Sequence, residues 1–238
     1  MTEWFPISSS GHLVCAQHLL GVKVPVLFDI LLHCGTLTAL LIFLRRDIVR
    51  LTRTVLTLDF RNDSMPLLIL VGTIPTALTG YLLHDFIVGL FTVKAVGFSF
   101  LATGVIVFLA RERRKGKVGF FSALCIGVAQ GMSLAPGISR SGITIASALW
   151  CGVERNEAMR FSFLLSIPAV LGAMAYEAGD AAFATVPPQY ALAGFLVSTL
   201  VGFLSLIVVA RIMRRGEIHY FSYYCFALGL LVIFAFAS

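Results

Sequence analysis

The sequence is organised around the stretch Pro136-Gly137-Ile138-Ser139-Arg140-Ser141-Gly142-Ile143-Thr144, which places hydroxyls, glycines and one arginine between two apolar segments. A charged side chain at membrane depth costs at least about 2.5–3.5 kcal/mol on insertion scales, so we expect a functional role for Arg140. A planar guanidinium matches phosphate oxygens two at a time, and glycines let a ligand approach the backbone. The stretch therefore predicts a phosphate-binding centre. The structural alternative is an arginine that reaches the lipid headgroups.

A second copy of this stretch lies near the start of the chain. Ile7-Ser8-Ser9-Ser10-Gly11 aligns with Ile138-Ser139-Arg140-Ser141-Gly142 at an offset of 131. Further along, the apolar residues 28–32 align with residues 161–165 at an offset of 133. A motif and its following apolar segment thus recur in the same order, which indicates an internal repeat. We predict one integral membrane domain over 1–238, with repeat halves of about 1–117 and 118–238.

The composition is that of an integral membrane protein. Of 238 residues, 58% are hydrophobic and 13% are charged, and the mean hydropathy is +0.94. A membrane-spanning helix needs about 20 mostly apolar residues. We predict an all-α polytopic membrane protein with six transmembrane helices, at about 28–44, 66–85, 93–110, 161–178, 190–210 and 218–237. Two more apolar regions, 1–22 and 119–150, are interrupted by the motifs and predict re-entrant helical hairpins.

The arrangement of these segments predicts an inverted-topology repeat. Each half holds one hairpin and three spans, and an odd number of crossings places the two copies in opposite orientations. The two hairpin tips should then meet near the middle of the membrane, as in transporters whose broken helices converge on a central site.

The distribution of positive charge predicts the orientation in the membrane. Most of the 18 basic residues fall in four regions that share one face, at 45–61, 111–117, 155–160 and 211–215, whereas Lys23 and Lys94 lie opposite. The crowded face should be cytoplasmic. We predict a multi-pass membrane protein with its C-terminus outside. The net charge of +6 therefore reports orientation rather than nucleic-acid binding. Residues 45–64 are expected to form a basic loop.

If the tips meet, their side chains form a set suited to phosphate transfer. A serine hydroxyl is weak until a base removes its proton, and His12 can act as that base with Glu3 orienting it. Backbone N–H groups of the helix after Gly142 add hydrogen-bond donors. The expected site contains Glu3, Ser8, Ser9, Ser10, Gly11, His12, Ser139, Arg140, Ser141, Gly142 and Thr144.

Each of these residues also has a structural alternative. Consecutive serines permit close contact between helices. His12 can cap the following helix, and Glu3, so near a terminus, can be exposed. His33 lies one helical turn beyond Asp29 on the same face and could border the cavity, but a role in helix packing is favoured.

At these residues the sequence resembles the undecaprenyl-diphosphate phosphatase family, also known as the bacitracin-resistance proteins. Thr2-Glu3-Trp4-Phe5-Pro6-Ile7-Ser8-Ser9-Ser10-Gly11-His12 is similar to the first motif region of the family. Residues 136–144 are similar to its Pro-Gly-x-Ser-Arg-Ser signature. The similarity in layout covers essentially the whole chain.

The resemblance implies hydrolysis of C55 undecaprenyl diphosphate to the monophosphate and inorganic phosphate, which recycles the lipid carrier for cell-wall synthesis. It implies a divalent cation, magnesium or calcium, and an active site that opens toward the outer side of the membrane. By the same resemblance Glu3 is an essential acidic residue and a cation ligand. Ser9 is the candidate nucleophile, His12 the general base or acid, and Arg140 the phosphate clamp.

One departure from the family pattern concerns the first motif. The family pairs two acidic or amide residues four positions apart, and the partner of Glu3 would fall before Met1. The second copy also has an apolar run before its motif, which the first copy lacks. We therefore expect the true start to lie upstream of Met1.

Two other functions are compatible with the sequence. A transporter or flippase of lipid phosphates could use the same inverted repeat without breaking a bond. Such a carrier needs Arg140 and the glycines but has less need of Glu3, Ser9 and His12 within ten residues. A scaffold without activity, disabled by a short N-terminus, is the third possibility.

Overall fold

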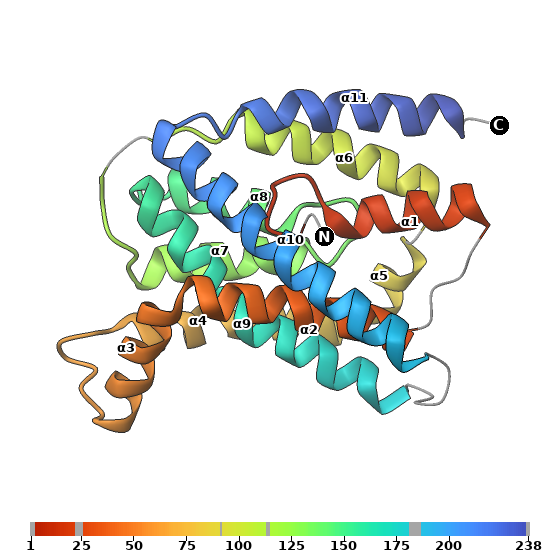
Figure 1. Ribbon diagram of the computed structural model, residues 1–238. Helices are drawn as coiled ribbons and strands as arrows, with labels where there is room; N and C mark the ends of the chain where they lie inside the picture. The colour runs from red at the N-terminus through yellow and green to blue at the C-terminus, as the bar shows by residue number, and fades with distance from the viewer. Residues whose placement is uncertain (1–2, 22–25, 91, 113–114, 181–186, 237–238) are drawn as a thin grey trace.

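The computed structural model describes residues 3–21, 26–90, 92–112, 115–180 and 187–236 (Figure 1). Lys23, Arg113 and Arg114, which the charge argument used, and the first residues of the chain lie outside this part. The described residues form eleven α-helices, and their one β-bridge joins Gly116 to Val153. The helices are α1 (Ser9–Leu20), α2 (Val26–Phe43), α3 (Arg45–Leu56), α4 (Met65–Leu82), α5 (His84–Gly89), α6 (Val93–Phe108), α7 (Phe120–Met132), α8 (Arg140–Trp150), α9 (Arg155–Asp180), α10 (Pro188–Arg215) and α11 (Tyr220–Ala235).

A helix lies at each of the six predicted spans, namely α2, α4, α6, α9, α10 and α11. Within the described part, three helices are long and apolar enough to cross a membrane: α4, the Arg155–Tyr176 part of α9, and α10. A fourth crossing results if the bent pair of α2 and α3 counts as one span. Helices α6, α7 and α11 are apolar but shorter. The all-helical fold with several apolar helices is that of a polytopic membrane protein.

Helix α3 corrects the prediction of a loop over residues 45–64. It follows α2 almost directly and is bent from it by 82°. Its apolar side chains Ile48 and Leu51 pack against the core, whereas Arg46 and Arg53 are exposed. A search for uninterrupted apolar runs misses such a helix, because its hydrophobic residues recur at helical spacing among charges. The short helix α5 lies between α4 and α6.

Helices α7 and α8 form a helix–loop–helix unit that returns to the end at which it began. The chain before α7 meets the chain after α8: the Gly116 amide donates to the Gly152 carbonyl over 3.0 Å, and the Glu154 amide donates to the Gly116 carbonyl over 2.9 Å. The loop between the two helices, residues 133–139, lies inside the molecule, since Pro136, Gly137 and Ser139 are buried.

The helix ends fall into two groups at opposite ends of the molecule (Figure 1). At one end, on the left of the view, lie α3, the starts of α7 and α9, and the ends of α8 and α10. Ion pairs join these basic segments, since Arg155 binds Glu112 and Arg160 binds Asp47. The ends of α1, α9 and α11 and the start of α10 lie at the other end.

The two motif copies make the same capping hydrogen bond, although the backbone of Ser8 has a positive φ and that of Ser139 is extended. Ser8 accepts a hydrogen bond from the Gly11 amide at the start of α1, and Ser139 accepts one from the Gly142 amide at the start of α8. The copies also touch each other, because a Cβ on Gly11 would lie 3.0 Å from the Gly137 Cα. Gly137 itself has a φ of 90°, a conformation that favours glycine. The two helix N-termini thus converge on one region in the interior.

Candidate active site

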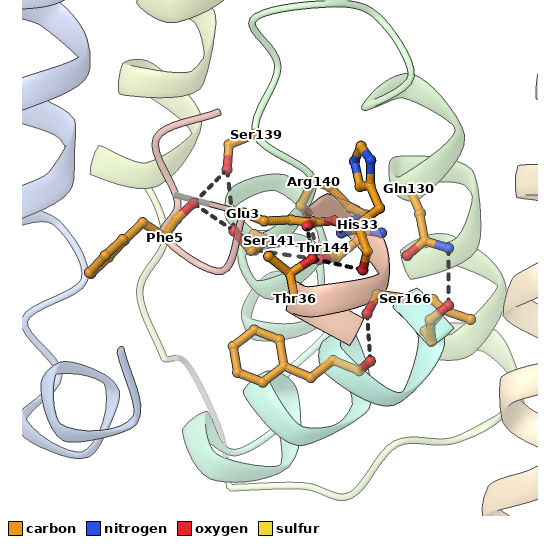
Figure 2. A network of polar contacts seen from close by, with 12 residues as sticks. Glu3, Phe5, His33, Thr36, Gln130, Ser139, Arg140, Ser141, Thr144 and Ser166 are labelled. Atoms are coloured by element: carbon orange, nitrogen blue, oxygen red, sulfur yellow. Dashed lines mark hydrogen bonds and ion pairs between the residues drawn. The ribbon is translucent and has the colours of Figure 1, made fainter. Parts of the chain in front are cut away.

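A buried ion pair joins the two motif copies at the centre of the site (Figure 2). Arg140, the first residue of α8, donates from Nη2 to the Glu3 Oε1 over 2.6 Å. The other carboxylate oxygen, Oε2, accepts a hydrogen bond of 2.5 Å from the Thr36 hydroxyl on α2. The side chains of Glu3 and Arg140 are 9% and 20% exposed. Both oxygens of Glu3 are therefore fixed, and the guanidinium is held where a ligand can reach it.

Trp4 supports the guanidinium from the neighbouring position. The Arg140 Cζ lies 5.7 Å from the centre of the Trp4 ring, within the range of a cation–π interaction. The Trp4 ring contacts Phe163 of α9 edge to face and is almost fully buried. The arginine is thus oriented by a carboxylate on one side and by a rigid aromatic ring on another.

The hydroxyls of the second motif hold the first motif in place. Ser141 donates to the Phe5 carbonyl over 3.0 Å, and Ser139 donates to the same oxygen over 3.4 Å. Thr144 donates to the Arg140 carbonyl over 2.7 Å and lies 2.5 Å from the Ser162 hydroxyl. These three side chains, which we expected to bind substrate, are buried and engaged in bonds within the protein.

A cavity of about 250 Å³ lies between the two motifs. One part of its wall is polar and comes from both motifs and from the three helices α2, α4 and α7: Glu3, Ser8, Ser9, Ser10, His33, Thr76, Gln130, Ser133, Ser139 and Arg140. The other part is apolar and comes mainly from α9: Leu134, Ile138, Ala169, Val170, Ala173 and Met174. The cavity therefore offers a polar side and an apolar side to the same ligand.

Six of the eleven expected site residues line this cavity: Glu3, Ser8, Ser9, Ser10, Ser139 and Arg140. The other five, Gly11, His12, Ser141, Gly142 and Thr144, are not among the residues that line it. Four polar residues of the cavity wall were not among the expected ones: Thr76, Gln130, Ser133 and His33, for which a packing role was favoured. The sequence feature that could have identified them is a polar side chain inside an apolar segment.

The expected pairing of Glu3 with His12 does not occur among the described residues. The Nδ1 atom of His12 lies 2.6 Å from the Ser8 carbonyl, and its Nε2 atom lies 2.7 Å from the Tyr224 hydroxyl of α11. A carbonyl only accepts, so Nδ1 carries a proton, and in the neutral imidazole Nε2 accepts from Tyr224. Glu3 instead binds Arg140 and Thr36. Tyr224, distant in sequence, was not foreseen.

The donor set of the cavity fits a hard divalent cation. No group of three His, Cys, Asp or Glu side chains that could hold a metal ion occurs in the described part of the chain. The cavity offers the Glu3 carboxylate together with hydroxyl and amide oxygens. Mg²⁺ typically binds one or two carboxylates and keeps water and substrate phosphates as its other ligands. The residues therefore fit a cation that enters with a phosphate ligand.

The Thr36 hydrogen bond allows a test of how Glu3 is positioned. Thr36→Val keeps the shape of the side chain but leaves Glu3 Oε2 without this donor. A hydrogen bond to a charged group contributes about 1.5–3 kcal/mol, so we expect the free energy of unfolding to fall by about that amount. Chemical denaturation of the purified protein measures the change. Thr38→Val is the matched control, because Thr38 donates to the Cys34 carbonyl of the same helix. Equal effects of the two substitutions would contradict this role.

The fold and the cavity together define a class: a polytopic helical membrane protein whose interior site pairs an arginine with hydroxyls and an apolar wall. The chain belongs to a particular family within that class, because the family model "Bacitracin resistance protein BacA" matches residues 1–231. This finding confirms the family likeness of the two motifs.

Several named relatives extend over nearly the whole chain. An undecaprenyl-diphosphatase of Carboxydothermus hydrogenoformans is 40% identical over 245 residues, covering 98% of this chain and 92% of the relative. One of Desulfosudis oleivorans is 41% identical over 250 residues, covering 96% and 92%. One of Methanosphaera stadtmanae is 37% identical over 255 residues, covering 98% and 92%.

Proposed function

We propose that this chain is an undecaprenyl-diphosphate phosphatase, which hydrolyses the C55 lipid diphosphate to the monophosphate and inorganic phosphate. In cells this activity would recycle the lipid carrier for cell-wall synthesis and confer bacitracin resistance. Membership of the BacA family and relatives named undecaprenyl-diphosphatase over almost their full length support the proposal.

One observation carries the proposal: Arg140 and Ser9 line the same cavity, and an apolar wall lies beside them. A guanidinium binds phosphate oxygens, a hydroxyl can attack phosphorus, and an apolar surface accepts the first part of a prenyl chain. A water-soluble phosphate ester would leave that apolar surface unused.

We also propose the membrane arrangement that the sequence predicts, with six crossings and two re-entrant hairpins in an inverted repeat. The return of the α7–α8 unit to its starting end supports it, as does the contact between Gly11 and Gly137. The gathering of basic segments at one end supports a cytoplasmic location for that end. The protein would then lie in the bacterial inner membrane with its C-terminus outside.

In the proposed reaction Arg140 binds and orients the terminal phosphate. Its bond to Glu3 uses Nη2, so other N–H groups of the guanidinium remain for phosphate oxygens. Backbone N–H groups at the starts of α1 and α8 add positive potential. The Ser9 oxygen attacks phosphorus, and the bond from phosphorus to the bridging oxygen breaks, which releases the lipid monophosphate. Water then cleaves the phosphoserine to give inorganic phosphate.

Removal of the Ser9 proton requires a rearrangement if His12 is the base. The two residues are three positions apart on α1 and therefore share a face. Both ring nitrogens of His12 are occupied, one by the Ser8 carbonyl and one by Tyr224. His12 can accept the serine proton only when Nε2 exchanges Tyr224 for the Ser9 hydroxyl.

A bound divalent cation, held by Glu3, would neutralise charge on the diphosphate group. We expect a chelator to reduce phosphate release from undecaprenyl diphosphate to the background rate, and excess Mg²⁺ or Ca²⁺ to restore it, because the substrate brings more negative charge than Arg140 can balance. Phosphate release in detergent, with and without EDTA, measures the effect. Full activity after exhaustive chelation would contradict the cation requirement.

Reconstituted protein distinguishes the phosphatase from a carrier of lipid phosphates. In liposomes that contain undecaprenyl diphosphate, the phosphatase releases inorganic phosphate. A carrier moves labelled lipid between leaflets and releases none. Transfer of lipid without phosphate release would overturn the proposed function.

A further inference from the structure

Gln130 of α7 lines the cavity, and its side-chain oxygen has no hydrogen-bond partner among the described residues. The side chain is 1% exposed and lines the cavity together with Glu3 and Arg140 (Figure 2). Its Oε1 atom is buried and has no hydrogen-bond partner among the described residues. Burial of a polar oxygen without a partner is costly, so the oxygen is expected to bind something that the protein itself does not supply.

The hydrogen bonds of the amide nitrogen fix which way the oxygen points. Nε2 donates to the Thr76 hydroxyl over 3.2 Å and to the Leu165 carbonyl over 3.4 Å. A flipped amide would put Oε1 against the Leu165 carbonyl, where two acceptors repel. Thr76 has its own acceptors, the Gly127 and Gly72 carbonyls, and so accepts from Gln130. The oxygen is therefore the free end of the amide.

The charge of the cavity indicates the kind of ligand. Glu3 and Arg140 are the only acidic and basic side chains, histidine aside, among the described residues of its wall, and they pair with each other. A diphosphate group carries at least two negative charges near neutral pH, so its entry leaves the cavity strongly negative. Such charge in a low-dielectric interior needs a counterion. A carbonyl oxygen repels the diphosphate but attracts a cation.

We propose that the Gln130 side-chain oxygen binds the divalent cation that enters with the diphosphate group. This inference rests on the proposed function for the identity of that group. An amide oxygen is an ordinary ligand of Mg²⁺ and Ca²⁺, and a neutral ligand permits release of the cation with the product. The second repeat half then contributes a cation ligand from α7 as well as the phosphate clamp from α8.

Two substitutions with opposite expected effects test the inference. Gln130→Met keeps the length of the side chain and removes the oxygen, whereas Gln130→Glu keeps an oxygen and adds a negative charge. The measurement is Mn²⁺ binding to the purified protein in nanodiscs, followed by electron paramagnetic resonance with methylenediphosphonate present. We expect Gln130→Met to weaken Mn²⁺ binding by on the order of 10-fold or more. We expect Gln130→Glu to tighten it about 10-fold, because ligand charge sets affinity.

The matched controls are the same two substitutions at Gln189, which is exposed at the start of α10. They should leave Mn²⁺ binding within twofold of the unmodified protein. Wild-type affinity in Gln130→Met, or no tightening in Gln130→Glu, would overturn the inference; a folding defect cannot produce the expected tightening. Phosphate release, measured on the same samples, tests the proposed function separately. If the unmodified protein hydrolyses the substrate but both Gln130 variants bind Mn²⁺ as it does, the role of Gln130 is refuted and the proposed function stands.

Discussion

Arg140→Ala is expected to lower phosphate release from undecaprenyl diphosphate by about 10³-fold or more, the scale on which a phosphate-binding arginine acts in phosphoryl transfer. The substitution removes the one positive side chain that lines the described part of the cavity, histidine aside. It also leaves the Glu3 carboxylate buried without its partner, so the cavity becomes negative where the phosphate should bind. The rate of phosphate release by protein reconstituted in liposomes measures the loss.

Two further variants separate this role from a general effect of charge. Arg140→Lys keeps the charge and loses the planar fork, so its activity should lie between those of the unmodified protein and Arg140→Ala. Arg46→Ala is the matched control, because Arg46 is exposed on α3, far along the chain from both motifs. Near-normal turnover by correctly folded Arg140→Ala would show that the assigned chemistry is wrong.

Ser9→Ala is expected to reduce phosphate release by about 10³-fold or more, since loss of a covalent nucleophile removes the two-step route. Ser9 is the first residue of α1 and lines the cavity, and among the described residues its hydroxyl has no hydrogen-bond partner. The neighbouring Ser8 instead caps the helix, so its loss should act mainly on stability. In quenched single-turnover reactions with substrate labelled on the terminal phosphate, the unmodified protein should become labelled. The Ser9→Ala protein should not.

The control for this variant is Ser64→Ala. Ser64 precedes α4, is exposed, and makes no capping hydrogen bond through its side chain. Its substitution should change neither turnover nor labelling. Labelled protein at normal yield from Ser9→Ala would assign the nucleophile to another group, and normal turnover without any labelled protein would assign it to water.

The apolar segments of the fold could be predicted from the sequence, because a run of hydrocarbon side chains determines where a helix can be buried. A helix occurs at every predicted span and in both arms of the second hairpin. Amphipathic α3 was missed for the converse reason: its charges hide the apolar stripe from a measure of mean hydropathy. The number of crossings depends on lipid thickness and helix tilt, and the sequence pattern does not specify these.

The site was predictable where residues are close in sequence or related by the repeat. The ion pair between Arg140 and Glu3 joins the two motifs that the repeat identified. The contributions of Thr36, Gln130 and Tyr224 depend on how helices far apart in the chain pack. A single polar residue in an apolar segment has the same appearance whether it binds a neighbouring helix or a ligand. Only the geometry separates these cases.

The hydroxyls of Ser139 and Ser141 both donate to the main-chain oxygen of residue 5, so this bond limits the three positions differently. Every amino acid supplies that oxygen, so position 5 can change freely as far as this bond is concerned, limited by the contact of Phe5 with Phe221. The two donors have no such freedom, because only a few side chains carry a short hydroxyl. A library covering all three positions should therefore recover many residues at 5 and almost only serine or threonine at 139 and 141.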